Sequence, residues 1–176
     1  MFSKLIISII VISFVSGCAT TNVDARKRIT FKQDGNDVIV TVDNKILFDV
    51  ADANLREDAK PVLDLLVKES LSRSKKDFQI EGHTDIRGAE QSNIKLSKAR
   101  AESVKRAIVE RGVLSSRIDT VGYASKFPVI ANASSESDHE QNRRAVIRIK
   151  NERVENVRTS SFELGFDSMI SSLGLK

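Results

Sequence analysis

The amino-acid sequence predicts an α+β fold in which a mixed β-sheet carries helices packed on one face. Two observations predict this fold class. Segments of alternating or β-branched residues recur along the chain, and segments with the apolar spacing of amphipathic helices lie between them. Strands that alternate with helices need crossover connections, whereas a hairpin near the start pairs antiparallel, so the sheet is expected to be mixed.

The strand predictions begin with a β-hairpin. Residues 28–32 and 37–42 alternate in polarity or are β-branched, and the polar turn of residues 33–36 joins them. Residues 46–49 are expected to form a short extended segment, and residues 123–141 a polar connection with one helical turn. Further strands are predicted where short alternating or apolar runs recur, at residues 78–82, 118–122 and 145–149.

Two helices are predicted between these strands. The first covers residues 59–71, where apolar residues share one face and Asp58 is the expected N-cap. The second covers residues 97–111, with Ser97 as the cap at its start and Gly112 at the position of a C-terminal cap.

The N-terminal residues 1–17 have the composition of a secretory signal peptide. A single basic residue, Lys4, precedes an apolar run, and small residues lead into Cys18, the only cysteine of the chain. This segment resembles a bacterial lipobox, so we expect Cys18 to be the lipidated first residue of the mature protein. An ordinary signal peptide with an incidental cysteine is one alternative. A transmembrane anchor is another, although the run is shorter than the roughly 20 apolar residues that a span needs.

The charge of the chain is mildly basic. Lys and Arg number 28 against 24 Asp and Glu, which gives a formal net charge of +4. These charges are interspersed rather than clustered, which is typical of a solvated mixed surface. Aromatic residues are scarce and Trp is absent, so we expect no nucleic-acid partner.

Two charged residues are the first candidates for a binding site. Asp85 lies in a glycine-bounded loop, residues 82–88, where a predicted strand ends. Arg100 falls in the first turn of the second helix if Ser97 caps it, and a helix N-terminus with an added guanidinium favours a carboxylate. Asp85 could accept from an ammonium group, so the pair would recognise a zwitterionic amino-acid end. A structural ion pair between the two side chains is the alternative.

Three ordered motifs between residues 46 and 149 resemble the C-terminal domain of outer membrane protein A, the OmpA-like domain. The same domain occurs in peptidoglycan-associated lipoproteins and in flagellar-motor stator proteins. The motifs are Gly82-His83-Thr84-Asp85-x-x-Gly88, Asn93-x-x-Leu96-Ser97-x-x-Arg100-Ala101 and Asn142-Arg143-Arg144-Ala145. The resemblance implies an OmpA-like βαβαβ sandwich, and non-covalent binding of peptidoglycan through the diaminopimelate residue of its stem peptide.

The resemblance also implies roles for individual residues. Asp85 and Arg100 match the family positions that contact the charged groups of diaminopimelate. Other residues match positions that line the same pocket: Phe48, Asp49, Arg87 and Leu96. A third group falls on motif positions that either contact the ligand or support the loops, and we favour support: Thr84, Asn93 and Arg144.

His83 raises the question of a metal site. It lies two residues from Asp85, and the second histidine, His139, is elsewhere in the chain. The fuller ligand set of a zinc centre is missing from the sequence, so we expect His83 to be a hydrogen-bonded residue that positions the loop. We expect neither a metal nor another cofactor.

The sequence divides the chain into four segments: a lipoprotein signal peptide (1–17), a lipidated N-terminus and tether (18–27), the OmpA-like domain (28–150) and a C-terminal tail (151–176). We expect a lipid-anchored protein of the outer membrane whose domain faces the periplasm. Ala19 is not the aspartate that commonly marks inner-membrane retention in enteric bacteria, which favours this location for a Gram-negative host.

Two other functions remain open at this point. The first is a cell-wall hydrolase, although the sequence offers no convincing nucleophile, metal or carboxylate pair for it. The second is an adaptor that engages envelope proteins through the tail, where Phe162, Phe166 and Met169 recur at helical spacing. A tail that folds over its own domain, or that stays disordered, explains the same spacing.

Overall fold

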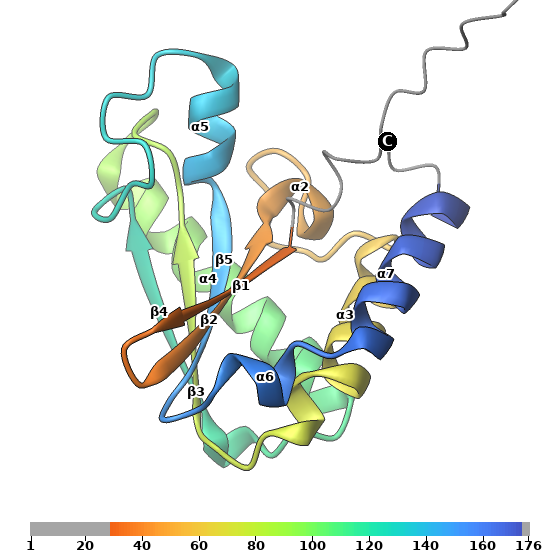
Figure 1. The fold of residues 1–176 in the computed structure, drawn as a ribbon. Coiled ribbons are helices and arrows are strands. Elements are labelled where there is room, and N and C mark those ends of the chain that lie inside the picture. Colours follow the sequence, from red (N-terminus) through yellow and green to blue (C-terminus); the bar gives the residue numbers. More distant parts are fainter. Residues whose placement is uncertain (1–28, 174–176) are drawn as a thin grey trace, which may run out of the picture.

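The computed structural model describes residues 29–173 (Figure 1). The predicted signal peptide, Cys18 and the tether lie outside the described residues. A five-stranded sheet forms the centre, in the order β1-β2-β5-β3-β4. Its strands are β1 (Ile29–Asp34), β2 (Asp37–Asp43), β3 (Phe78–His83), β4 (Ile118–Ala124) and β5 (Arg144–Ile149). The β3–β4 pair is parallel and the other pairs are antiparallel, which confirms the predicted mixed sheet.

Helices pack on one face of this sheet, as predicted. In β2 the alternate residues Val38, Val40 and Val42 are buried, because successive side chains of a strand point to opposite faces. They join a core with apolar residues of the long helices α3 (Ala59–Glu69) and α4 (Glu90–Glu110). Shorter helical segments complete the described chain: α2 (Asn44–Leu47), η1 (Leu71–Arg73), η2 (Ser115–Arg117), α5 (Glu136–Asn142), α6 (Val154–Val157) and α7 (Ser160–Leu173).

The start of α4 differs from the prediction. The helix begins at Glu90 rather than Ser97. Its first three residues, Glu90 to Ser92, are polar and exposed, so they give no apolar spacing from which this start could be predicted. Ser97 lies inside the helix, where its hydroxyl donates to the Ile94 carbonyl and accepts from the backbone N–H of Ala124. The predicted end is confirmed, since Gly112 follows the helix with a φ of 94°.

Two close approaches fix α4 against the sheet. A Cβ atom added to Gly82 of β3 would lie 2.0 Å from the carbonyl oxygen of Ser97. One added to Gly122 of β4 would lie 2.5 Å from the backbone nitrogen of Lys98. Only glycine allows the backbones to approach this closely, so these two residues set where α4 sits on the sheet.

The connections correct two further predictions. Residues 46–49 are not an extended segment: α2 takes in Asn44–Leu47, and only Phe48 forms an isolated bridge, with Leu55. Asp58 precedes α3 but its carboxylate makes no capping bond, because it accepts hydrogen bonds from Arg56 instead.

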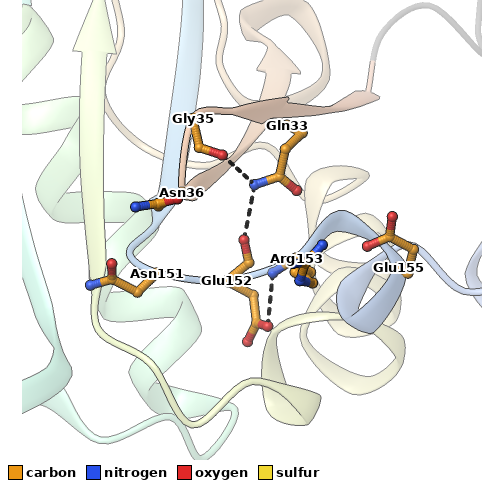
Figure 2. A pocket seen from close by; sticks show the side chains of 7 residues that line it. All are labelled: Gln33, Gly35, Asn36, Asn151, Glu152, Arg153 and Glu155. Atoms are coloured by element: carbon orange, nitrogen blue, oxygen red, sulfur yellow. Dashed lines mark hydrogen bonds between the residues drawn. The ribbon is translucent and has the colours of Figure 1, made fainter.

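The tail folds against the rest of the chain. Helix α7 lies alongside α3 (Figure 1), and the rings of Phe162 and Phe166 are buried in the common core. Figure 2 shows the junction that begins the tail, a pocket beside the β1–β2 turn. There Gln33 Nε2 donates to the carbonyls of Gly35 and Glu152, at 3.1 and 3.0 Å. The apolar residues that suggested a docking segment are thus used inside this molecule.

Within residues 29–173, none of the helices combines the length and the apolar composition that crossing a bilayer requires.

Candidate functional site

A pocket of about 300 Å³ opens where α2, the loop after β3, the middle of α4 and the start of α5 meet. It brings together all six residues that the family resemblance placed at the ligand, and two of the three assigned to loop support. These eight are Phe48, Asp49, Thr84, Asp85, Arg87, Asn93, Leu96 and Arg100. Six more residues line it that the sequence analysis did not select: Asn44, Lys45, Val50, Ala51, Glu136 and Arg143.

Arg100 is the buried cation of this pocket, with 3% of its surface exposed. It lies in the middle of α4, so the prediction that it stands in the first helical turn is wrong. Its guanidinium stacks 5.1 Å from the centre of the Phe48 ring and donates to two backbone carbonyls, those of Asp52 at 2.8 Å and Asp49 at 3.2 Å.

None of the carboxylates of the described chain forms an ion pair with Arg100. Burial, and then the nearby positive charge of Arg143, lower the pKa of Arg100 to about 10. The group therefore remains charged at neutral pH. The negative charges of Asp52 and Asp85 oppose this shift in the pKa of Arg100, although neither carboxylate is paired with it. A buried charge without a bonded counter-charge is costly, and an anion that enters the pocket would relieve that cost.

Asp85 is the buried anion, and its partners are Arg87 and Arg143 rather than Arg100. One carboxylate oxygen accepts from the backbone N–H of Arg87 at 3.0 Å. The other accepts from the guanidinium groups of Arg87 at 2.7 Å and Arg143 at 2.6 Å. Burial alone would raise the pKa of Asp85, but these hydrogen bonds outweigh it and hold the pKa below its ordinary value. The predicted alternative, an Asp85–Arg100 ion pair, is not what the structure forms.

Glu136 completes a network of two acids and two arginines. It accepts from Arg87 at 2.8 Å and from Arg143 at 2.7 Å, and these bonds lower the pKa of Glu136 to about 2. A capping box between Ser135 and Asp138 holds the first turn of α5, which carries Glu136. One signal for this network is present in the sequence, because Arg143 belongs to the third motif, next to Arg144.

The residues that could serve either as contacts or as loop support bond mainly to the backbone. Thr84 donates to the Asp85 carbonyl at 3.0 Å, and Asn93 donates to the Arg87 carbonyl at 2.9 Å. Arg144 does not line this pocket. Its guanidinium donates to the carbonyl of Phe127 at 2.9 Å.

His83 also lies outside the pocket lining. It is buried, and its Nε2 lies 3.3 Å from a carboxylate oxygen of Glu81. Burial lowers the pKa of His83, and the hydrogen bond to Glu81 opposes that shift. Within the described residues, no group of three or more His, Cys, Asp and Glu side chains could hold a metal ion.

The pocket thus offers three chemical features to a ligand. Arg100 is a desolvated cation that forms no ion pair with an acid of residues 29–173. Asp85 is an anion that arginines keep ionised, and Phe48 and Leu96 supply apolar walls. This arrangement suits a ligand that bears a carboxylate beside a short aliphatic chain.

Comparison with curated proteins finds relatives that are similar to this chain over about three-fifths of its length. It is 36% identical over 110 residues to the peptidoglycan-associated lipoprotein of Rhizobium meliloti, a match that covers 62% of this chain and 62% of that relative. The chain thus spans about three-fifths of the length of this curated relative.

Two solved structures are similar at the level of fold and sequence. The cell wall anchor of the T6SS from Pseudomonas aeruginosa matches with a TM-score of 0.64 and 28% identity, over 72% of this chain and 90% of that one. The peptidoglycan-associated lipoprotein from Burkholderia pseudomallei matches with a TM-score of 0.51 and 29% identity, over 58% of this chain and 86% of that one.

A family model described as the OmpA family matches residues 47–143, which include α2 in part, the long helices α3 and α4, and every residue of the pocket except Asn44 and Lys45. Because this match takes in more than half of the chain, the protein belongs to the OmpA family.

Proposed function

We propose that this protein binds peptidoglycan non-covalently in the pocket around Arg100. The observation that carries the proposal is the buried guanidinium of Arg100, which has no acidic partner among the described residues. Peptidoglycan stem peptides present free carboxylates, and one of them would supply the missing counter-charge through a charge-assisted hydrogen bond. The names of the relatives, a peptidoglycan-associated lipoprotein and a cell wall anchor, support the same ligand.

The ligand group is proposed to be the diaminopimelate of the stem peptide. Its carboxylate would bind Arg100, and its ammonium group would bind Asp85, whose first carboxylate oxygen has only one backbone donor in the structure. An ionised carboxylate offers about four lone-pair sites, so Asp85 keeps room for a further donor beside its arginine partners. The aliphatic chain of diaminopimelate would lie against Phe48 and Leu96, with Asp49 and Arg87 at the edge of the pocket.

Binding, rather than turnover, is the proposed activity. A wall hydrolase that uses two carboxyl groups needs one of them protonated to act as a general acid. In this pocket Asp85 and Glu136 both have lowered pKa values, because Arg87 and Arg143 stabilise their ionised forms. Neither acid is suited to donate a proton at neutral pH. We therefore expect no release of soluble fragments when the protein is incubated with purified wall.

The protein is further proposed to tether the outer membrane to the wall. In this arrangement Cys18 carries the lipid and the domain faces the periplasm, where envelope proteins are its proposed additional partners. Membrane fractionation of the parent and a Cys18→Ser variant tests the anchor. The parent should be recovered in outer-membrane fractions and the variant should not. Equal recovery of both in the membrane would rule out the lipid at Cys18 as the anchor.

Co-sedimentation with purified peptidoglycan tests the binding itself. The full chain is compared with its Asp85→Ala and Arg100→Ala variants, after circular dichroism has established that each is folded. Loss of one charge-assisted contact is expected to weaken binding about tenfold or more. Arg111→Ala is the matched control, because Arg111 pairs with the exposed carboxylate of Asp64 and does not line the pocket. Binding by the folded Arg100→Ala variant at the parent's level would contradict the proposed site.

The same assay tests the identity of the ligand group. Free meso-diaminopimelate should compete with the wall for the parent protein. Lysine, which has both ammonium groups but lacks the second carboxylate, should compete more weakly. Equal competition by the two amino acids would leave peptidoglycan as the ligand but reject diaminopimelate as the group that the pocket recognises.

A further inference from the structure

Asn44 is a pocket residue that neither the motifs nor the family match includes. It is the first residue of α2, directly after β2, and 5% of its surface is exposed. Its backbone is well bonded: the N–H donates to the carbonyl of Arg143 at 3.3 Å, and the carbonyl accepts from the N–H of Phe48 at 2.8 Å. The backbone of Asn44 therefore joins the two segments that flank the pocket.

The side chain of Asn44, in contrast, makes no hydrogen bond to any residue that the structure describes. Its Oδ1 atom is buried without a partner, and its Nδ2 atom has no acceptor in the described chain. Buried amide groups in native proteins are nearly always bonded, and an exception asks for a cause. Four other described residues have a buried unpartnered side-chain atom, but none of them lines this pocket: Ser70, His83, Arg117 and His139.

The two ends of the amide differ in their access. Oδ1 is enclosed by protein atoms and has no hydrogen-bond partner among them. Nδ2 is not enclosed in this way, so it remains accessible from open space. Because Asn44 lines the pocket, the accessible donor of its amide can be reached by a molecule bound there. Arg100 is a second donor group in the same pocket, and it forms no ion pair with an acid of the described chain.

The Asn44 amide and the Arg100 guanidinium are two donor groups that a ligand could satisfy only with two separate acceptor oxygens. We propose that Asn44 Nδ2 donates a hydrogen bond to a second oxygen of the bound stem peptide, a carboxylate or peptide carbonyl other than the carboxylate held by Arg100. Asn44 is then a specificity-determining residue, which favours ligands with acceptors at both places. The inference rests on the proposed binding of peptidoglycan and assigns a contact within it.

A residue that contacts the ligand can be told from one that stabilises the fold by measuring how its replacement changes binding and melting temperature. Asn44→Leu keeps the branched shape of the side chain and removes an amide that the unliganded protein leaves unbonded. It should therefore melt at the same temperature as the parent or higher, while it binds peptidoglycan about five- to tenfold more weakly. A residue with a merely structural role would lose stability when it is replaced.

The experiment measures both quantities on the full chain, by co-sedimentation with purified peptidoglycan and by thermal melting. Asn156→Leu is the matched control, because the amide of Asn156 is bonded to the Glu152 carboxylate at 2.7 Å and lies outside the pocket. It should show the opposite pattern, with a lower melting temperature and unchanged binding. Asn44→Asp removes the donor, adds a negative charge and keeps the shape, so it should bind at least as weakly as Asn44→Leu.

Each other outcome overturns the inference in a distinct way. Binding by Asn44→Leu within about twofold of the parent means that the amide makes no contact. Parallel loss of stability and binding means that the amide supports the fold, and tighter binding by Asn44→Asp means that the side chain accepts rather than donates. If the folded parent itself fails to sediment, the proposed function is wrong and this inference falls with it.

Discussion

The buried ring of Phe162 gives a direct test of whether α7 is part of the folded domain. The side chain is 2% exposed, and its ring lies 5.1 Å from the ring of Phe31 in an edge-to-face contact and 5.7 Å from the stacked ring of Phe166. Replacing a buried phenylalanine by alanine typically costs about 3–5 kcal/mol. The two aromatic contacts place Phe162→Ala toward the upper part of that range. A domain of this size is stable by only about 5–15 kcal/mol, so the variant should lose a large fraction of its stability.

Urea unfolding followed by circular dichroism measures this loss. The midpoint should fall while the slope of the transition stays the same, because a change in midpoint alone reports stability. Leu164→Ala on the same helix is the control. Leu164 is 73% exposed, and its replacement should shift the free energy of unfolding by less than about 0.5 kcal/mol. A Phe162→Ala variant that unfolds like the Leu164→Ala control would refute the packing of α7 on α3 and restore the tail as a docking segment.

Two further predictions concern Gly82 and Asp85. Gly82→Ala should destabilise the domain by several kcal/mol, roughly the cost of overpacking a core. The reason is that its Cβ would meet the carbonyl oxygen of Ser97 at 2.0 Å. A melting temperature equal to that of the parent would show that α4 can move aside. Hydrogen bonds from Arg87 and Arg143 hold the pKa of Asp85 below its ordinary value. The stabilisation that they give the folded protein is present above that ordinary value, and it is lost as the pH falls through the lower pKa of the folded state. The free energy of unfolding of the parent should therefore converge with that of Asp85→Asn as acid is added, and a constant difference would contradict the pairing.

The sheet could be predicted from the sequence because its signal is local. In β2, the alternation of Val38, Val40 and Val42 with polar residues records which face of the strand is buried, so the hairpin was visible without any knowledge of its neighbours. Gly112 marked the end of α4 for a similarly local reason, since its left-handed backbone favours glycine.

The start of α4 was missed because its signal is not local. Apolar spacing appears only where a helix packs, and the first residues of α4, Glu90 to Ser92, are polar and exposed. The network around Asp85 was missed for a related reason. Arg143 and Arg144 are neighbours, and residues adjacent along an extended chain point to opposite sides. Sequence alone could not say which of them reaches Asp85, and the structure selects Arg143.

The two charged residues of the pocket are linked by the packing of their motifs. Gly82 lies three residues before Asp85, and Ser97 lies three residues before Arg100. Gly82 and Ser97 are in backbone contact, which a Cβ atom would prevent. The same contact that seats α4 on β3 therefore fixes the start of the loop that carries Asp85 and the helical turn that carries Arg100. The glycine of the first motif and the serine of the second thus position the side chains that follow them, and a change at Gly82 should reach ligand binding through the placement of both charges.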